Sequence, residues 1–125
     1  MSAVKRILIV DDEPHILRSL GFVLEKAGYQ VLQARSGAEA LRLVDQRPDL
    51  VFLDIMMPAP DGYEVCRRIK SSQAHSGTHV IMLTAKGLDA DRQRSLEAGA
   101  DGYMTKPFSP SRALERVRAA LSKAA

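Results

Sequence analysis

The sequence predicts a single α/β domain over residues 1–125, built as a three-layer sandwich of parallel strands between helices. One observation is that the apolar segments are short continuous runs rather than alternating ones, which is typical of strands buried on both faces of a parallel sheet. A second observation is that helical patterns separate these runs. Five predicted strands alternate with five predicted helices, as in repeated right-handed βαβ units.

Four of the strand-forming runs end abruptly in reactive polar side chains. The runs and the residues that follow them are Ile7–Val10 before Asp11 and Asp12, Leu50–Leu53 before Asp54, Val80–Leu83 before Thr84, and Tyr103–Thr105 before Lys106. In an open parallel sheet, functional groups collect beyond the carboxyl ends of the strands. We therefore expect three carboxylates, a hydroxyl and an ammonium to converge at one edge.

The first helix is predicted after Asp12, because Pro14 suits a first helical turn and Gly28 can end the helix in a left-handed conformation. Between them, apolar residues recur at the spacing of a buried helix face. These residues are Ile16, Leu20, Val23 and Ala27. A short strand, Gln30–Ala34, should follow this helix.

Two later helices have start signals of their own. Ser36 and Glu39 match a capping box, in which the hydroxyl and the carboxylate bond free backbone amides, and this helix should stop before Pro48. The turn-forming stretch Pro58–Gly62 precedes the third helix.

The fourth helix, about Leu88 to Ala98, differs from the others because charged and amide side chains dominate it. Leu88, Leu96 and small alanines are left to pack, and so few buried apolar contacts imply low local stability and easier movement. The last helix begins at Ser109 as a cap, with Pro110 at the first helical position.

Composition excludes several classes of protein. The chain has 125 residues, of which 46% are hydrophobic and 26% charged, as expected for one globular domain. Its net charge of +3 comes from scattered Lys and Arg, so we expect no direct binding of nucleic acid. The apolar run Ile7–Val10 is too short for a signal peptide or a membrane span, and the single Cys66 excludes an internal disulfide. The expected location is the cytoplasm.

The expected site brings Asp11, Asp12 and Asp54 together beside one ammonium, that of Lys106. Clustered carboxylates repel one another unless their pKa values rise or a cation binds among them. Mg²⁺ fits such a site, because it commonly takes one or two carboxylates, keeps several waters and acts beside phosphate.

These motifs, in this order, resemble the receiver domain of bacterial two-component response regulators, and the resemblance covers the chain from Ile7 to Leu121. The matching segments are Val10–Glu13, Leu53–Pro58 with Asp61 and Gly62, Leu83–Ala85, Gly99–Tyr103 and Lys106–Phe108. Each segment alone is weak evidence, but the ordered set is highly specific. The resemblance implies the flavodoxin-like strand order 2-1-3-4-5.

The resemblance implies that Asp54 accepts a phosphoryl group and carries it as an acyl phosphate. It also implies that Mg²⁺ is held by four groups, which are Asp11, Asp12, Asp54 and the backbone carbonyl of Met56. Asp11 would act partly through water. The ion would offset repulsion between the Asp54 carboxylate and the incoming anionic group.

Other residues acquire roles from the same resemblance. Lys106 and Thr84 would donate hydrogen bonds to the phosphoryl oxygens. Tyr103 would be a switch aromatic that turns inward when Thr84 moves toward the phosphoryl group. A cis peptide bond before Pro107 would aim Lys106 at the site.

The function implied by the resemblance is a phosphorylation-dependent switch in a two-component phosphorelay. A sensor histidine kinase or a histidine phosphotransfer protein would donate the phosphoryl group. The face formed by the fourth helix, the fifth strand and the fifth helix would signal to a downstream effector protein or domain, or would form a homodimer. The chain would catalyse only its own Mg²⁺-dependent phosphorylation and slow dephosphorylation. It would be a stand-alone domain or the receiver part of a larger transcription regulator or other effector protein.

Three alternatives remain at this point. An Asp-nucleophile phosphatase of the haloacid-dehalogenase type has a second aspartate two positions after the nucleophile, where this chain has Met56. A flavin- or nucleotide-binding module would have a glycine-rich loop after the first strand, where Asp11–Pro14 would instead repel phosphate unless a metal intervenes. The third alternative is a DNA-binding fragment.

Overall fold

The structure, a computed structural model, describes residues 4–85 and 89–122 and alternates strand with helix along the chain. The strands are β1 (Arg6–Val10), β2 (Gln30–Ala34), β3 (Leu50–Asp54), β4 (His79–Thr84) and β5 (Gly102–Thr105). The helices in the described ranges are α1 (Pro14–Lys26), α2 (Gly37–Leu43), α3 (Gly62–Ser71), α4 (Asp89–Glu97) and α5 (Pro110–Leu121), with a short 3₁₀ helix η1 (Val44–Gln46). The predicted α/β class is confirmed.

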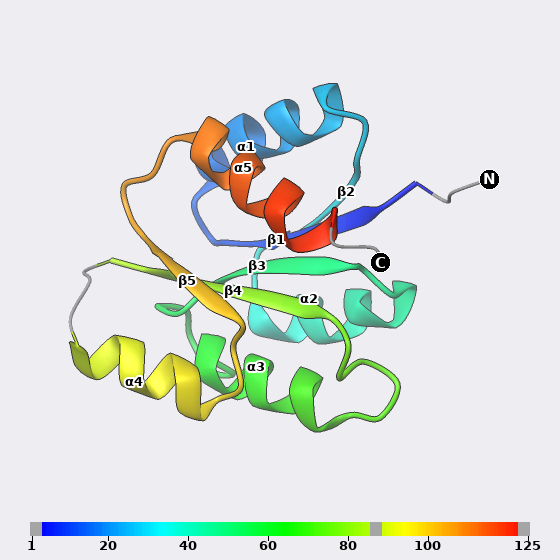
Figure 1. The fold of residues 1–125 in the computed structure, drawn as a ribbon. Coiled ribbons are helices and arrows are strands. Elements are labelled where there is room, and N and C mark those ends of the chain that lie inside the picture. Colours follow the sequence, from blue (N-terminus) through cyan, green and yellow to red (C-terminus); the bar gives the residue numbers. More distant parts are fainter. Residues whose placement is uncertain (1–3, 86–88, 123–125) are drawn as a thin grey trace.

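The five strands pair in parallel in the order β2-β1-β3-β4-β5, which confirms the predicted topology. The register aligns their carboxyl ends, since Val10 lies opposite Leu53 and Thr84 lies opposite Thr105. The polar side chains at the ends of β1, β3, β4 and β5 therefore belong to the same edge of the sheet (Figure 1).

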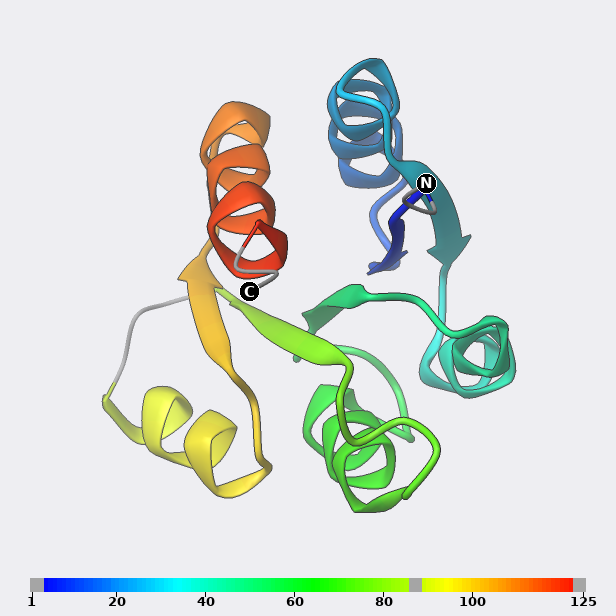
Figure 2. The ribbon, with the colours of Figure 1, turned by 45° about the vertical axis from the view of Figure 1, so that its right-hand side comes forward.

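Helices cover both faces of the sheet. α1 and α5 pack on one face and α2, α3 and α4 on the other, and Figure 2 shows the same three layers from a second direction. Alternate residues of a strand face opposite layers. In β3, Leu50 and Phe52 pack with α1 and α5, whereas Val51 and Leu53 pack with α2 and α3. Within the described ranges, every helix is too short or too polar to cross a membrane.

Two predicted helix signals act as expected. Ser36 Oγ accepts a hydrogen bond from the backbone amide of Glu39 at 3.1 Å, and the Glu39 carboxylate accepts one from the amide of Arg35 at 2.7 Å. This exchange satisfies two free amides at the start of α2. Gly28 follows α1 with a φ of 99°, a left-handed conformation that glycine adopts without steric cost.

The predicted buried face of α1 is right for Leu20 and wrong for the other three residues. The buried residues are Leu17, Leu20, Gly21 and Leu24, whereas Ile16, Val23 and Ala27 are half-buried. Gly21 lies on the buried face beside β2, where a Cβ would lie 2.9 Å from Nε2 of Gln33. That Nε2 donates a hydrogen bond to the carbonyl of Leu17 at 3.1 Å. The close approach of the helix to the edge strand at a glycine is a contact that an apolar pattern does not reveal.

α4 is as polar as predicted, and Ala98 after it is buried, as expected for one of the small alanines. Leu96 is 58% exposed, which contradicts the expectation that it packs, and Ser95 is buried instead. Ser95 can be buried because its hydroxyl donates to the carbonyl of Asp91 at 2.9 Å. Leu88, the predicted start of the helix, lies outside the described residues.

Candidate functional site

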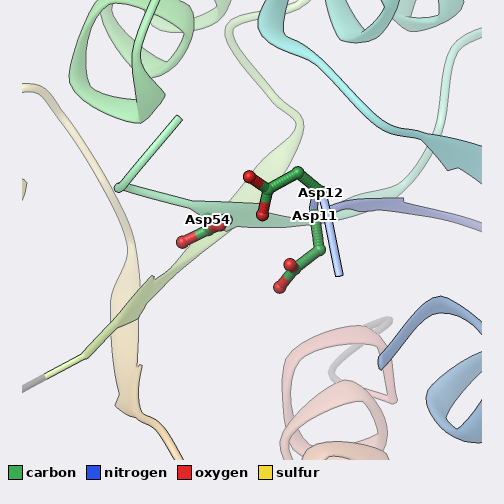
Figure 3. Close-up of side chains that lie close together, drawn as sticks. All are labelled: Asp11, Asp12 and Asp54. Carbon is green, nitrogen blue, oxygen red and sulfur yellow. The ribbon is translucent and has the colours of Figure 1, made fainter. Parts of the chain in front are cut away.

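Three carboxylates meet at the carboxyl edge of the sheet. Asp11 and Asp12 follow β1, and Asp54 is the last residue of β3, which is paired with β1. One oxygen atom from each lies within 4.8 Å of the others, and Figure 3 shows the side chains gathered at the ends of the two strands. Asp11 and Asp54 are buried, whereas Asp12 is exposed. Such a set of oxygen atoms can hold a metal ion.

Lys106 extends its ammonium into this cluster from the end of β5. Its backbone amide donates to the carbonyl of Thr84 at 2.6 Å, and the Lys106–Pro107 peptide bond is cis. Nζ lies 2.8 Å from Asp11 Oδ2 and 3.6 Å from Asp54 Oδ2. It also donates to Glu13 Oε1 at 2.9 Å. One ammonium is thus shared among three carboxylates, and its closest partners are Asp11 and Glu13.

Burial and charge shift the pKa values of this cluster. Burial first, and then the neighbouring Asp11, raise the pKa of Asp54 to about 6, although Lys106 and the amide of Met56 oppose the increase. Burial alone would lower the pKa of Lys106, but its bonds to Asp11 and Glu13 raise it overall. The same bond to Lys106 lowers the pKa of Glu13. Ionisation of Asp54 is therefore disfavoured in this site.

The residues fit a divalent cation. Asp54 and Asp11 are buried carboxylates that repel each other, and the Lys106 ammonium is 3.6 Å from Asp54. Burial is the main reason why the pKa of Asp54 is raised, and a cation bound by these oxygens would offset the second cause, which is repulsion from Asp11. The backbone amide of Met56, two residues after Asp54, donates a hydrogen bond to Asp54 Oδ1 at 3.2 Å, and the residue is 70% exposed. Its backbone therefore lies beside the acceptor while its side chain points to solvent.

Thr84 ends β4 at the same edge. Its Oγ1 is buried and has no hydrogen-bond partner among the described residues. Thr84 also lines a cavity of about 190 Å³ together with Ile55, Met56, Ala85 and Asp91. The hydroxyl is thus available to an oxygen atom that enters the site.

Tyr103 lies on β5 and is half-buried. The guanidinium carbon of Arg92 lies 5.4 Å from the centroid of its ring, and Arg116 donates to its backbone carbonyl at 3.2 Å. Tyr103 thus joins β5 to both α4 and α5.

Sequence reasoning did not assign a role to two residues at this edge. Glu13 bonds Lys106, and the signal available in the sequence was a third acidic residue directly after Asp11 and Asp12. Gly62 starts α3 against the backbone of Asp54, whose carbonyl oxygen a Cβ at Gly62 would contact. The amide of Gly62 also donates to the carbonyl of Ile55 at 3.2 Å, which fixes the loop after β3.

Five parallel strands in this order, with an acidic cluster and a lysine at their carboxyl ends, define a flavodoxin-like α/β domain. The chain belongs to the response regulator receiver domain family, because residues 7–118 match the sequence model of that family. It is therefore a signalling domain of two-component systems. This membership favours the receiver interpretation over the phosphatase and nucleotide-binding alternatives.

Three related proteins illustrate the similarity. The transcriptional regulatory protein ResD of Bacillus subtilis is 47% identical over 120 residues, which are 95% of this chain and 49% of ResD. The chemotaxis response regulator CheY4 of Vibrio cholerae has a TM-score of 0.89 at 30% identity, and the match covers 95% of this chain and all of that one (100%). The receiver domain of DrrB from Thermotoga maritima, solved in a BeF₃-activated form, has a TM-score of 0.88 at 36% identity over 97% of this chain and 100% of that chain. The chain spans about half the length of the curated relatives it matches.

Proposed function

We propose that this domain is a phosphorylation-dependent switch in which Asp54 accepts a phosphoryl group from a sensor histidine kinase or a histidine phosphotransfer protein. The observation that carries the proposal is the buried Asp54 carboxylate, within 4.8 Å of two other carboxylates and 3.6 Å from the ammonium of Lys106. A carboxylate can attack an anionic phosphoryl group only if nearby positive charge offsets the repulsion between them. This arrangement places an ammonium and a set of metal-binding oxygens around one carboxylate.

In the transfer, a carboxylate oxygen of Asp54 forms a bond to phosphorus while the bond from phosphorus to the donor nitrogen breaks. The nitrogen keeps the electron pair, and Asp54 becomes an acyl phosphate. Lys106 donates to a phosphoryl oxygen from the position it occupies beside Asp54. Thr84 supplies a neutral donor through its free hydroxyl. Slow hydrolysis then returns the carboxylate, so the domain acts on itself alone.

Mg²⁺ is the proposed cofactor, held by Asp11, Asp12, Asp54 and the backbone carbonyl of Met56. Hard carboxylate and carbonyl oxygens are the ligands that this ion prefers. When bound, it would neutralise charge on the acceptor and on the incoming phosphoryl group. The protein's own contribution is to bury Asp11 and Asp54 and to hold them together against their repulsion.

The output is proposed to pass through the face formed by α4, β5 and α5, with Thr84 and Tyr103 as the switch pair. A groove of about 670 Å³ on this face is lined by Tyr103 and by arginines from both helices. Few apolar contacts hold α4, as the exposure of Leu96 indicates, so α4 can move with little loss of packing. Through this face the domain would contact a downstream effector protein, the effector domain of a larger transcription regulator, or a second copy of itself in a homodimer.

The proposed location of the protein is the cytoplasm.

The proposal is tested by incubating the purified chain with Mg²⁺ and a small acyl-phosphate donor labelled on phosphorus. Wild-type protein should acquire one label that is stable to acid and labile to base, and Asp54→Asn should acquire none. Asp45→Asn, on η1, is the matched control and should label normally. Persistence of the label in Asp54→Asn would relocate the acceptor. Many turnovers of a general phosphate ester would instead indicate a phosphatase.

A further inference from the structure

Glu13 occupies a position that the proposed phosphoryl transfer leaves unexplained. We infer that Glu13 is a positioning residue that holds the ammonium of Lys106 beside Asp54 when the aspartate cluster is engaged by a cation. The inference rests on the proposed function, because it concerns how Lys106 is presented to a phosphoryl group. It adds a residue that acts on the reaction through Lys106 rather than by contact with phosphorus.

The distances around Lys106 carry the first step. An ammonium has three hydrogen-bond donors, and the nearest oxygens to Nζ belong to Asp11 at 2.8 Å, Glu13 at 2.9 Å and Asp54 at 3.6 Å. Nζ donates a hydrogen bond to Glu13 and forms an ion pair with Asp11. The third carboxylate, the acceptor, lies just beyond a direct hydrogen bond.

The second step is that a bound cation would take oxygens from Asp11 but not from Glu13, so Glu13 stays available to Lys106. Asp11 belongs to the group of three carboxylates that can hold an ion together, and Glu13 does not belong to that group among the described residues. A cation bound by Asp11 would compete with Lys106 for the same oxygens. The bond to Glu13 has no such competitor, so it can keep Lys106 in place in the loaded site.

The third step concerns how firmly Glu13 itself is held. It is the N-cap residue of α1, yet its side chain makes no capping hydrogen bond. Its backbone is fixed on both sides, since its amide donates to Asp11 Oδ1 at 2.9 Å and its carbonyl accepts from Ile16 at 3.1 Å. The backbone of Glu13 is therefore held in place, and its carboxylate can reach Lys106, which is 93 positions later in the chain.

The consequence follows from the nature of the lysine side chain. Lys106 is a flexible four-carbon stem with a point charge at its end, and it has no fork of donors to fix its direction. A phosphoryl group on Asp54 extends outward from the carboxylate, toward an ammonium that already lies 3.6 Å from Oδ2. With Glu13 present, the ammonium is already positioned to bind that group. Without Glu13, each binding event must also immobilise the flexible Lys106 side chain, which costs conformational entropy.

The test compares Glu13→Ala and Glu13→Gln with wild type at saturating Mg²⁺. The matched control is Glu25→Ala, which removes an exposed carboxylate of α1 itself. The probe is beryllium trifluoride, the group present in the activated DrrB receiver domain. Glu13→Ala should weaken its binding by about tenfold, the order expected for one hydrogen bond to a charged group. Glu13→Gln keeps an acceptor oxygen and should recover part of the loss, and Glu25→Ala should bind as wild type.

A second measurement separates positioning from a general structural effect. If Glu13 acts through Lys106, then Glu13→Ala should add no further loss in a Lys106→Ala background. Undiminished or tighter binding in Glu13→Ala would overturn the inference, and so would a full additional loss in the double variant. Failure of the wild type to bind the probe or to be labelled at Asp54 would overturn the proposed function itself, and is recognised before any variant is compared.

Discussion

The guanidinium carbon of Arg94 lies over the ring of Tyr63, 4.0 Å from the ring centroid. Tyr63 belongs to α3 and is buried, and its hydroxyl donates to Asp91 Oδ1 of α4 at 3.3 Å. One tyrosine thus receives two residues from α4. Because Leu96 of that helix is largely exposed, these polar and cation–π contacts are a main attachment of α4 to the domain.

Tyr63→Phe should loosen α4 while leaving the rest of the domain intact. The substitution keeps the ring beneath Arg94 and removes the hydroxyl that bonds Asp91. Loss of one such bond should lower the free energy of unfolding by about 1 kcal/mol. Hydrogen exchange is the direct measurement, and the α4 amides should exchange faster than those of α1. Equal acceleration in both helices would mean that Tyr63 supports the whole fold and not α4 in particular.

Asp54→Asn should stabilise the protein in Mg²⁺-free buffer at neutral pH. Since the pKa of Asp54 rises from 3.8 to about 6 on folding, the folded state binds the proton more tightly than the unfolded state. Stability from this group is therefore present below about pH 4 and is lost as pH rises to about 6. The loss is about 3 kcal/mol at 1.36 kcal/mol per pKa unit.

The measurement is denaturant unfolding of both proteins at pH 4 and pH 7.5. The gain from Asp54→Asn should be larger at the higher pH, and adding Mg²⁺ should shrink it, because only the wild type has the acidic ligand at position 54. A gain that is independent of pH would mean that Asp54 ionises as easily in the folded chain as in the unfolded one.

Lys106→Ala should lower the stability of the protein and raise its affinity for Mg²⁺. Without the ammonium, buried Asp11 loses the counter-charge that lies 2.8 Å away, and the free energy of unfolding in chelator should fall by about 2 kcal/mol. Mg²⁺ should then bind several-fold more tightly, because no cation of the protein competes for Asp11. Titration calorimetry checks the affinity, and Lys5→Ala is the control. Weaker Mg²⁺ binding in Lys106→Ala would show that the lysine supports the metal site instead of competing with the ion.

Gly62→Ala should damage the site through the backbone. A Cβ at position 62 would contact the carbonyl oxygen of Asp54 and the Cα of Ile55, so α3 or the end of β3 must shift. We expect a loss of about 1–3 kcal/mol in stability, as for an overpacked core, together with weaker Mg²⁺ binding. Gly77→Ala is the matched control, since nothing lies within 4 Å of a Cβ there. Retention of both properties in Gly62→Ala would show that the loop after β3 can give way.

Sequence patterns predicted the sheet well because each strand is buried on both faces. Leu50–Leu53 is apolar at every position, and such a run has few other stable places in a domain of this size. The strand ends then located Asp54, Thr84 and Lys106 at one edge without knowledge of any contact. The order of the strands came from the family resemblance, since apolar runs do not say which strands are neighbours.

The failures have a common physical origin, which is that they depend on neighbours far along the chain. The buried face of α1 includes Gly21, which lies against Gln33 of β2, and a residue without a side chain is not recognised in an apolar pattern. Leu96 is apolar, yet it lies on the exposed side of α4. Glu13 accepts a hydrogen bond from a lysine 93 positions away, a contact that arises only because β1 and β5 end at the same edge of one sheet.

The hydroxyl of Thr84 is an unused hydrogen-bond donor at the carboxyl edge of the sheet. Its Oγ1 has no partner in the described part of the chain, and the residue lines a cavity of about 190 Å³. If a phosphoryl oxygen arrives beside Asp54, as we propose, it can accept a bond from Thr84 without any existing hydrogen bond within the protein being broken.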